Sequence, residues 1–589
     1  MDRRGFLKSA SWFTVVAAGT GLAACGDADV APSGSYTFPL GVASGDPKES
    51  SVVFWTRCLP KGGSGAAVRL DVSTDAGFSN LVATVQLSAG AEHDFTVRAK
   101  VTGLAPATRY WYRFVAGADA SAVGQTRTAP AAAASPAQLR FAWMTCQDWS
   151  VNHWAAMDLI AAEDLDFLVH LGDYIYETVG AAFQAGAAEP AHGKITLPGG
   201  VAGGGAVYAN TVDDYRTLYR TYRGDARLQE LHRKFPMIVI WDDHEFSDDC
   251  WQDHQTYTNA NLRQTARRRA ANQAWAEYMP VDWGDVSFDL NNAAYDNIRI
   301  YRDFKFGNLM HLVMTDERLY RDDHVVSEAA YARMLQHDAA NGNDSIGARY
   351  FVPQPLLQQF EQADTQALGR VPSILGGTQA QWWKDTMKAS TATWKIWGNE
   401  VTLNRMWLDL RNQAPAPYNQ LYVVNADGWD GYPSHRAELM TWLRTQNVAN
   451  VVAITGDLHA FQCGVIYDNA DPATGKAVAV DFVSAGISSS SFYKYLSAGS
   501  GGSPLAPLVA TPQVFDQVLR ANNPGFAYAD HDAQGYAVAT VTPASLTVVF
   551  NKVKPLNADG SKPAAPLAKR TRITLAAGST TPKVEDNIA

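Results

Sequence analysis

The chain has 589 residues, of which 47% are hydrophobic, 11% aromatic and 18% charged, and its formal net charge is -10 at neutral pH. This length and apolar content allow two or more domains with sizeable cores, which argues against an intrinsically disordered chain and against a small scaffold held by disulfides. A net negative chain has no general attraction for nucleic acid or anionic lipid, so we expect no specific nucleic-acid binding and only local binding of phosphate groups.

Residues 1–25 are typical of an export signal. Arg3 and Arg4 precede an apolar stretch over residues 12–24, and the pattern resembles the signal that directs folded proteins to the twin-arginine translocation machinery. The Leu-Ala-Ala sequence before Cys25 also resembles a lipoprotein processing box, in which Cys25 would carry a lipid anchor; the alternative is cleavage among these small residues, with Cys25 incidental. We therefore expect an exported protein that is periplasmic, held at the cell surface as a lipoprotein, or secreted.

Residues 36–128 are expected to form a small β domain. Strand-like runs at residues 51–57, 67–72, 83–87 and 109–114 are separated by clusters of Gly, Pro, Asp and Ser. This spacing predicts a β-sandwich of the immunoglobulin or fibronectin type III sort. An Ala- and Pro-rich linker follows at residues 129–137.

Residues 138–552 alternate between strand-like runs and helical patterns, which predicts an α/β catalytic domain. The helical patterns cover residues 213–234, 261–278 and 435–444. Two late strand-like runs, at residues 536–541 and 545–550, predict a hairpin that closes a second sheet.

Two Gly-rich stretches, residues 193–205 and 497–507, are expected to be surface loops, with a lid over a functional site as the less favoured alternative. The tail, residues 553–589, is rich in Pro, Ala and Thr and is expected to pack poorly.

Four apolar runs end in residues of metal-binding type. These are residues 139–146 with Cys146, 167–177 with Asp173 and Tyr176, 237–245 with Asp242, Asp243 and His244, and 451–459 with Asp457 and His459. One Gly-Asp pair after an apolar run is as often a turn or a helix cap. Because strand ends meet at the edge where open α/β sheets bind ligands, four such ends predict a single metal site.

The residue types at these ends indicate a site for two different metals. Asp173 is the candidate bridge between two cations about 3.5–4 Å apart, a spacing that suits phosphate esters. Cys146 and Tyr176, when ionised, suit ferric iron (Fe3+), and the neighbouring carboxylates suit calcium (Ca2+). Asp457 and His459 lie two residues apart in an extended chain and therefore point to the same side.

Two further side chains are candidates for catalysis. In the Asp242-Asp243-His244 sequence, one carboxylate would bind metal while His244 donates a hydrogen bond or a proton to the phosphate or the leaving oxygen. Arg318, at the end of another apolar run, could clamp a phosphate; an ion pair with a neighbouring carboxylate is the favoured alternative.

The cysteines other than Cys25 are Cys58, Cys146, Cys250 and Cys463. Export into an oxidising compartment favours disulfides, but the spacing does not reveal a pairing. Cys146 lies at a strand end with other ligand candidates, so we expect a metal thiolate there.

Taken together and in this order, the motifs resemble the alkaline phosphatase D (PhoD) family of phosphomonoesterases and phosphodiesterases. The matching motifs are Gly41-Val-Ala-Ser-Gly-Asp46, Cys146-Gln147, His170-Leu-Gly-Asp173 with Tyr176, Trp241-Asp-Asp-His-Glu245, Thr455-Gly-Asp-Leu-His459 and Gly535-Tyr536. The resemblance covers residues 36–552.

The resemblance implies a metallophosphatase-like four-layer α/β sandwich preceded by the small β-sandwich, with one Fe3+ and with Ca2+. Carried over by motif position, the iron ligands are Cys146, Asp173, Tyr176, Asp457 and His459. Asp173 and the Asp242-Asp243 pair form the calcium side. The coordinating member of that pair is left open, although Asp243 holds the position before the histidine where related metallophosphatases place an Asn ligand.

The expected activity is hydrolysis of a small-molecule phosphate ester by metal-bound hydroxide, with His244 assisting the leaving oxygen. The resemblance does not decide between monoesters, diesters and phospholipids, so a phospholipase D-like action is one alternative. An exported iron oxidoreductase is a weaker one, because the chain has no Cys-x-x-Cys or haem-attachment motif. A third reading makes the β domain a binding module attached to a decayed α/β scaffold.

Overall fold

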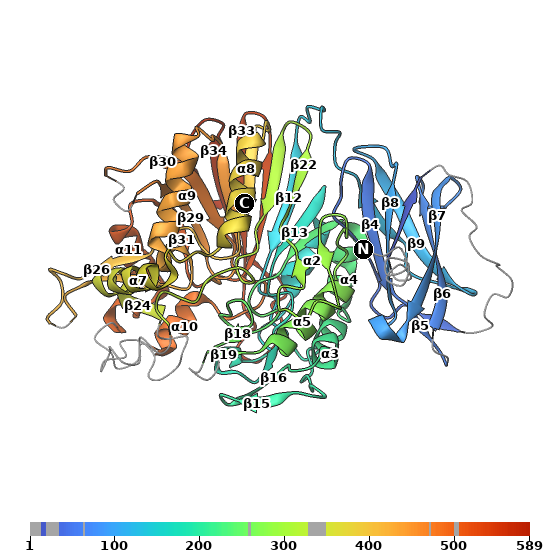
Figure 1. The fold of residues 1–589 in the computed structure, drawn as a ribbon, viewed down its shortest axis with the longest axis horizontal. Coiled ribbons are helices and arrows are strands. Elements are labelled where there is room, and N and C mark those ends of the chain that lie inside the picture. Colours follow the sequence, from blue (N-terminus) through green and yellow to red (C-terminus); the bar gives the residue numbers. More distant parts are fainter. Residues whose placement is uncertain are drawn as a thin grey trace.

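The computed structural model describes residues 13–18, 35–62, 65–256, 261–327, 349–416, 418–469, 473–499 and 506–588 (Figure 1). Arg3, Arg4 and Cys25, which carry the predicted export signal and lipid anchor, lie outside these residues. Within that signal-like segment, β1 (Phe13–Ala17) pairs in parallel with β8 (Thr96–Thr102). In the part of the chain that is described, no helix is both long and apolar enough to cross a membrane.

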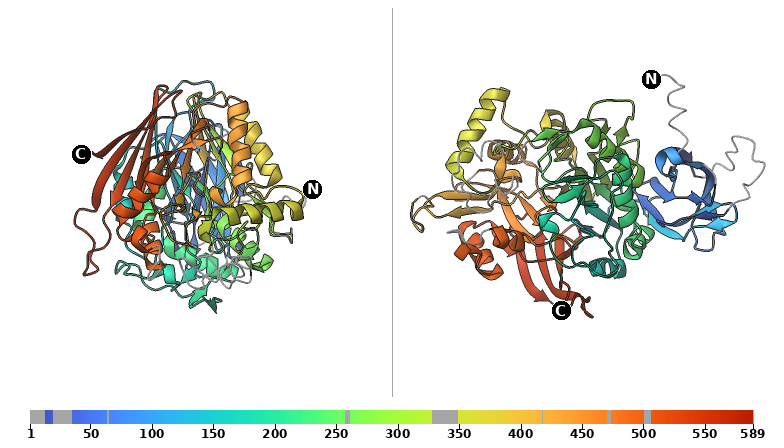
Figure 2. Two further views of the ribbon diagram at one scale, coloured as in Figure 1. Left: turned by 90° about the vertical axis from the view of Figure 1, so that its left-hand side faces the viewer. Right: turned by 90° about the horizontal axis from the view of Figure 1, so that it is seen from below.

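The N-terminal region forms the predicted β-sandwich at one end of the molecule (Figure 2). One sheet contains β8, β4 (Ser51–Arg57) and β3 (Val42–Gly45), and the other contains β10 (Asp119–Ala120), β9 (Arg109–Ala116), β6 (Gly65–Ser73), β7 (Leu81–Gly90) and β11 (Gly124–Arg127). Alternate residues of β9 are buried, as expected for a strand with one face on a core. Phe54 and Tyr112, from opposite sheets, pack edge to face in that core.

The first of these sheets continues into the catalytic domain. β3 pairs in parallel with β17 (Met237–Ile240) at a single register position, Gly45 opposite Met237. The sheet therefore has eleven strands in the order β1-β8-β4-β3-β17-β13-β12-β32-β33-β34-β35.

A buried ion pair supports the contact between the N-terminal domain and β17. The carboxylate of Asp46 accepts hydrogen bonds from Nε and Nη2 of Arg302 at 3.0 and 2.9 Å, and from the amide of Asp282 at 2.8 Å. The Gly41–Asp46 motif thus connects the two domains and lies outside the predicted metal site.

We expect Gly45→Val to lower the free energy of unfolding by about 2–4 kcal/mol, because any Cβ at this position would overlap the carbonyl oxygens of Pro280 and Met237. Thermal unfolding measures the change. Gly377→Ala is the control, since a Cβ there would meet no atom within 4 Å; equal loss in both variants would contradict the steric explanation.

The catalytic domain is a sandwich of two sheets. In the first, β17, β13 (Phe167–Leu171) and β12 (Leu139–Met144) run parallel, followed by the antiparallel strands β32 (Gly535–Val541), β33 (Ser545–Val553), β34 (Leu567–Ala576) and β35 (Lys583–Ile588). The second has the order β22 (Arg302–Phe306), β23 (Met310–Met314), β25 (Trp394–Gly398), β28 (Val451–Thr455), β30 (Ala477–Val483), β29 (Phe461–Tyr467) and β31 (Phe526–Asp530). Apolar residues of both sheets share one core.

Helices cover the outer faces and complete the predicted four layers. The first sheet carries α2 (Ala155–Ala162), α3 (Val212–Tyr222), α4 (Ala226–Lys234) and α5 (Thr265–Tyr278); the second carries α8 (Gly376–Ala389) and α9 (Pro433–Thr445) (Figure 1). The predicted helix over residues 213–234 is two helices, because Asp225 accepts the amide of Arg227 and begins α4. The helices predicted at 261–278 and 435–444 correspond to α5 and α9.

Smaller elements lie at the edges of the sandwich. They are β14 (Thr178–Val179), β15 (Val201–Gly203), β16 (Ala206–Tyr208), β24 (Tyr350–Pro353), β26 (Trp407–Asp409), β27 (Leu421–Asn425), α7 (Gln354–Leu368), α10 (Phe492–Gly499) and α11 (Pro512–Asn522). The Gly-rich stretch 193–205 includes β15, which pairs with β16. Residues 500–505 of the other Gly-rich stretch lie outside the described residues.

Two expectations about the C-terminal region are corrected. The hairpin β32–β33 forms, but it joins the first sheet through β12 and does not belong to the second. The tail was expected to pack poorly, yet β34 pairs along the length of β33 and buries Ile573 and Leu575. Alternate apolar residues outweigh the Pro- and Thr-rich composition there.

Candidate metal centre

The ends of four strands bring the predicted ligands together, but they do not share one sheet edge as expected: β12, β13 and β17 belong to the first sheet and β28 to the second. Cys146 follows β12, Asp173 and Tyr176 follow β13, Asp242 to His244 follow β17, and Asp457 and His459 follow β28. Ligand atoms lie within 4.8 Å of one another in the groups Cys146-Asp173-His459, Asp173-Asp243-His244, Asp242-Asp243-Asp457 and Asp243-Asp248-Asp249. Because Asp173 and Asp243 each belong to more than one group, these residues form one continuous cluster.

Four candidate ligands have left-handed backbone conformations. The φ angles are 54° at Cys146, 53° at Asp173, 59° at Asp457 and 57° at His459. This region is sparsely populated by residues other than glycine, and such strain concentrates at functional sites. Asp457 and His459 therefore do not lie in an extended chain, as the sequence analysis expected; they follow the end of β28 in a left-handed turn.

The hydroxyl of Tyr176 lies in the part of the cluster that contains Cys146, Asp173 and His459. Its hydroxyl donates to Asp173 Oδ2 at 3.0 Å and lies 3.2 Å from His459 Nε2 and 2.7 Å from Ser489 Oγ. Nδ1 of His459 lies 2.8 Å from the carbonyl oxygen of Ser490, which leaves Nε2 to face the cluster. Burial, and then the charge of Asp173, raise the pKa of both Tyr176 and Cys146 well above their ordinary values, so a cation is needed to keep these groups ionised.

His244 lies near Asp173 and Asp243. It is held by Glu177, a carboxylate that the sequence analysis missed. Its Nδ1 is 2.6 Å from Glu177 Oε2, and its Nε2 is 3.5 Å from Asp248 Oδ1. Glu177 also accepts the amide of Asp248 at 2.8 Å. Burial lowers the pKa of His244, but the charges of Glu177, Asp243 and Asp173 outweigh burial and raise it well above its ordinary value.

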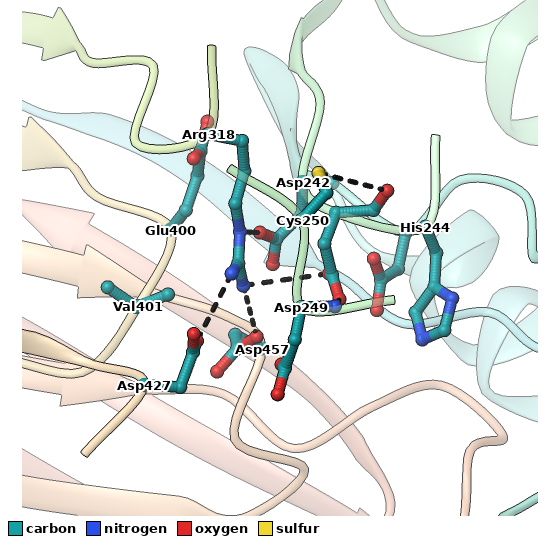
Figure 3. Close-up of polar contacts among 12 residues, drawn as sticks. Asp242, His244, Asp249, Cys250, Arg318, Glu400, Val401, Asp427 and Asp457 are labelled. Carbon is teal, nitrogen blue, oxygen red and sulfur yellow. Dashed lines mark hydrogen bonds and ion pairs between the residues drawn. The ribbon is translucent and has the colours of Figure 1, made fainter. Parts of the chain in front are cut away.

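Arg318 is completely buried behind the cluster (Figure 3). Its Nε donates to Asp242, its Nη2 to Asp457 Oδ1 at 2.8 Å, and its Nη1 to Asp427 Oδ2 at 3.1 Å. The guanidinium is therefore hydrogen-bonded to three carboxylates, and its Nη2 lies 3.6 Å from a fourth, Asp243. Asp427 is a partner that the sequence analysis did not identify.

Glu245 fixes the backbone of two ligand-bearing turns. Its carboxylate accepts the amides of Asp173 at 3.0 Å, Tyr174 at 2.6 Å and Asp242 at 2.7 Å. Burial raises its pKa to about 8 despite these amides. Its place directly after His244 could have suggested a role, but no spacing in the sequence predicts which amides it accepts.

A cavity of about 90 Å³ opens onto the cluster. Its lining includes Asp173, Asp243, His244, Asp457 and His459, the further carboxylates Asp148, Asp248, Asp249 and Asp427, and the aromatic rings of Phe183, Tyr350, Phe492 and Tyr495. Asp242, Cys146, Tyr176 and Arg318 lie behind this surface.

Three buried carboxylate oxygens in the cluster have no hydrogen-bond partner among the described residues: Asp173 Oδ1, Asp242 Oδ2 and Asp243 Oδ1. Such atoms are costly unless a cation satisfies them. The donors also include a thiol, a phenol and an imidazole, so the cluster fits metal binding. All four described cysteines are free and buried, and the expectation that Cys146 is not half of a disulfide is consistent with this.

Comparisons with known proteins agree with the predicted resemblance. Residues 141–550 match the family model for the PhoD-like phosphatases, and residues 24–130 match the model for their N-terminal domain. The chain is 29% identical to "Alkaline phosphatase D" of Bacillus subtilis (strain 168) over 553 residues, which cover 92% of this chain and 82% of that protein. It also matches a solved structure described as "Structure of PhoD" with a TM-score of 0.74 and 27% identity, over 94% of this chain and 93% of the other. The chain therefore belongs to the PhoD-like phosphatase family and is a phosphoric ester hydrolase of the alkaline phosphatase D type.

Proposed function

We propose that the chain is an exported, metal-dependent hydrolase of phosphate esters, in which Asp173 would be a ligand shared by Fe3+ and Ca2+. The observation that carries this proposal is the overlap of two ligand groups at Asp173, together with the unpartnered buried oxygens of Asp173 and Asp243. The route through Arg3 and Arg4 and the anchor at Cys25 are part of the proposal and rest on the sequence alone.

The donor types divide the cluster between the two metals. Cys146, Tyr176 and His459, with Asp457, would hold Fe3+, because ionised thiol and phenol groups and imidazole suit that ion better than Ca2+. On the other side Asp173 lies within 4.8 Å of Asp243 and His244, and the two carboxylates there suit a hard cation such as Ca2+.

Of the adjacent residues Asp242 and Asp243, Asp243 is the better candidate for a Ca2+ ligand. Asp243 lines the cavity and shares a ligand group with Asp173. One oxygen of Asp242 accepts Nε of Arg318, so Asp242 would support the site from behind.

The metal pair, when bound, supplies an activated water and neutralises the charge that develops on the phosphate. His244 would hold a proton on the imidazole and pass it to the leaving oxygen, because it lines the cavity and the charge of Glu177 contributes to its raised pKa. Glu177 orients the ring through Nδ1. The ester would enter the cavity lined by Asp243, His244 and His459, where its oxygens would meet the metals and His244.

Arg318 is a candidate to clamp the phosphate, with an ion pair to a neighbouring carboxylate as the favoured alternative, and the clamp stays a prediction. The carboxylates around the guanidinium support a different role: Arg318 would position Asp242 and Asp457 and offset their mutual repulsion.

We expect chelation of calcium to lower the hydrolysis of bis(para-nitrophenyl) phosphate by about a hundredfold or more, since a lost cation removes several kcal/mol of transition-state stabilisation. The measurement uses purified protein before and after a calcium-selective chelator, with metal content determined in parallel. Added Ca2+ should restore the rate while iron content stays constant. Full activity in calcium-free protein would refute the calcium assignment.

The same assay with para-nitrophenyl phosphate compares a monoester with the diester. The ratio of the two rates distinguishes phosphatase from phosphodiesterase action. Release of headgroup from phospholipid vesicles, tested beside them, decides on the phospholipase D-like alternative.

A further inference from the structure

One aromatic side chain of the catalytic cavity comes from a stretch of very small residues. Between positions 180 and 188 every residue is glycine or alanine except Phe183 and Gln184. Phe183 lies in a short 3-10 helix, η2 (Ala182–Gln184), is half-buried and lines the cavity. The stretch therefore brings a single large apolar surface to the edge of the metal centre.

Gln184 holds this part of the chain in place. Its buried side chain donates through Nε2 to Asp148 Oδ1 at 3.3 Å. Its Oε1 accepts the amide of Ala181 at 3.2 Å and the hydroxyl of Thr178, in β14, at 3.4 Å. These bonds tie η2 to β14 and to Asp148, which also lines the cavity. The position of Phe183 is thus fixed by its neighbour in the sequence.

The ring of Phe183 lies next to the imidazole of His244. The two ring centroids are 5.2 Å apart and the ring planes meet at 49°. The ring of Tyr176 is 4.1 Å from that of His244 and 6.2 Å from that of Phe183, so the three rings form one group. Because Phe183 is half-buried and borders the cavity, part of its surface is open to a ligand.

The proposed role of His244 determines which part of a substrate meets Phe183. An acid must lie within hydrogen-bond reach, about 2.6–3.2 Å, of the oxygen that it protonates. The carbon attached to the leaving oxygen is only one covalent bond farther away. A group built on that carbon therefore comes within packing distance of a ring whose centroid is 5.2 Å from the imidazole.

We propose that Phe183 determines the specificity of the enzyme for the leaving group, and that it favours an alcohol whose oxygen is attached to an aromatic ring or another flat apolar group. This inference rests on the proposed function, through the role of His244 as the acid, and it does not depend on which metals occupy the centre. Packing on Phe183 stabilises the bound ester and the transition state alike, so it acts on KM more than on kcat.

The test compares methyl phenyl phosphate with methyl trifluoroethyl phosphate. In each diester the more acidic alcohol leaves, and the group that stays on phosphorus is the same. We expect Phe183→Ala to lower kcat/KM by about tenfold or more for the phenyl ester, mainly through KM, and by about threefold or less for the trifluoroethyl ester. Dividing each rate by that of the parent enzyme cancels the intrinsic reactivity of the ester.

Three further variants complete the test. Phe183→Tyr keeps the ring and should retain the parental selectivity. Phe183→Leu keeps apolar bulk without a ring, should lose an intermediate part of the selectivity, and replaces Phe183→Ala if that variant does not fold. Phe78→Ala is the matched control, because Phe78 is a half-buried phenylalanine of the N-terminal domain that packs against Arg113. It should leave the kinetics of both esters unchanged.

Equal losses for the two esters in Phe183→Ala would show that the ring only supports His244, and would overturn the proposal. Unchanged kinetics for both esters would overturn it as well. If the parent enzyme hydrolyses neither ester, the proposed function fails together with this inference. If the parent hydrolyses both and the variant keeps their ratio, the role of Phe183 alone is refuted.

Discussion

Asp173→Asn is expected to lower kcat for phosphate ester hydrolysis by about a thousandfold or more, which corresponds to about 4 kcal/mol of transition-state stabilisation. The amide has nearly the volume of the carboxylate and can still accept the hydroxyl of Tyr176, so the fold is preserved. It cannot supply a charged oxygen to two cations at once. Hydrolysis of the two para-nitrophenyl esters and metal analysis of the variant measure the effect.

The stability of the same variant provides an independent check. Burial and the neighbouring charges of Asp243, Asp242 and Glu245 raise the pKa of Asp173 well above its ordinary value. In metal-free protein, a neutral side chain removes this repulsion, so the thermal midpoint of Asp173→Asn should equal or exceed that of the metal-free parent.

Asp409→Asn is the matched control for these measurements, because Asp409 pairs with Arg411 at the surface. It should leave both kcat and metal content unchanged. A variant at Asp173 that keeps the parental kcat and both metals would rule out the bridging role.

His244→Asn is expected to lower kcat by about a hundredfold to ten-thousandfold for esters with poor leaving groups, because such groups need a proton as the bond breaks. The loss should be much smaller for para-nitrophenol, which leaves readily as an anion. A series of aryl diesters with leaving groups of increasing pKa measures this dependence. An equal loss across the series would argue that His244 only binds the phosphate.

Glu177→Gln tests how far Glu177 sets the pKa of His244, the proposed acid. Because the charge of Glu177 contributes to the raised pKa of His244, its loss lowers that pKa. An acid is active only while protonated, so the alkaline limb of the kcat profile should move to lower pH in Glu177→Gln. His311→Asn, at a buried histidine on β23 that pairs with Asp303, is the control and should not move it.

The convergence of the ligands from the first sheet could be predicted because it depends on strand ends alone, whereas the approach of Asp457 and His459 depends on how the second sheet packs against the first. Cys146, Asp173 and Asp243 follow parallel neighbours in one sheet, so an apolar run that ends in a donor is enough to place each at the same edge. The α/β class followed from the alternation of strand and helix patterns, and the four-layer arrangement was implied by the resemblance to the family.

The partners of these ligands could not be predicted, because they come from distant parts of the chain. Arg318 meets Asp427, which is 109 residues away, and Asp457, which is 139 residues away. Glu177 and His244 are 67 residues apart. Such pairs depend on which strands the fold brings close together and on the loops that follow them, and no periodicity in a single segment records that packing. In the tail, the Pro- and Thr-rich composition predicted poor packing, and the burial of Ile573 and Leu575 at alternate positions of β34 was not foreseen.

The joint at Gly45 bears on whether the N-terminal domain could be a detachable module. Removing the N-terminal domain would make β17, a wholly apolar strand from Met237 to Ile240, an exposed edge strand of the sheet. Exposed margins of this kind recruit strands from other molecules and lead to aggregation. We therefore expect removal of the N-terminal domain to promote self-association through this sheet edge, and we expect the two domains to unfold as one cooperative unit.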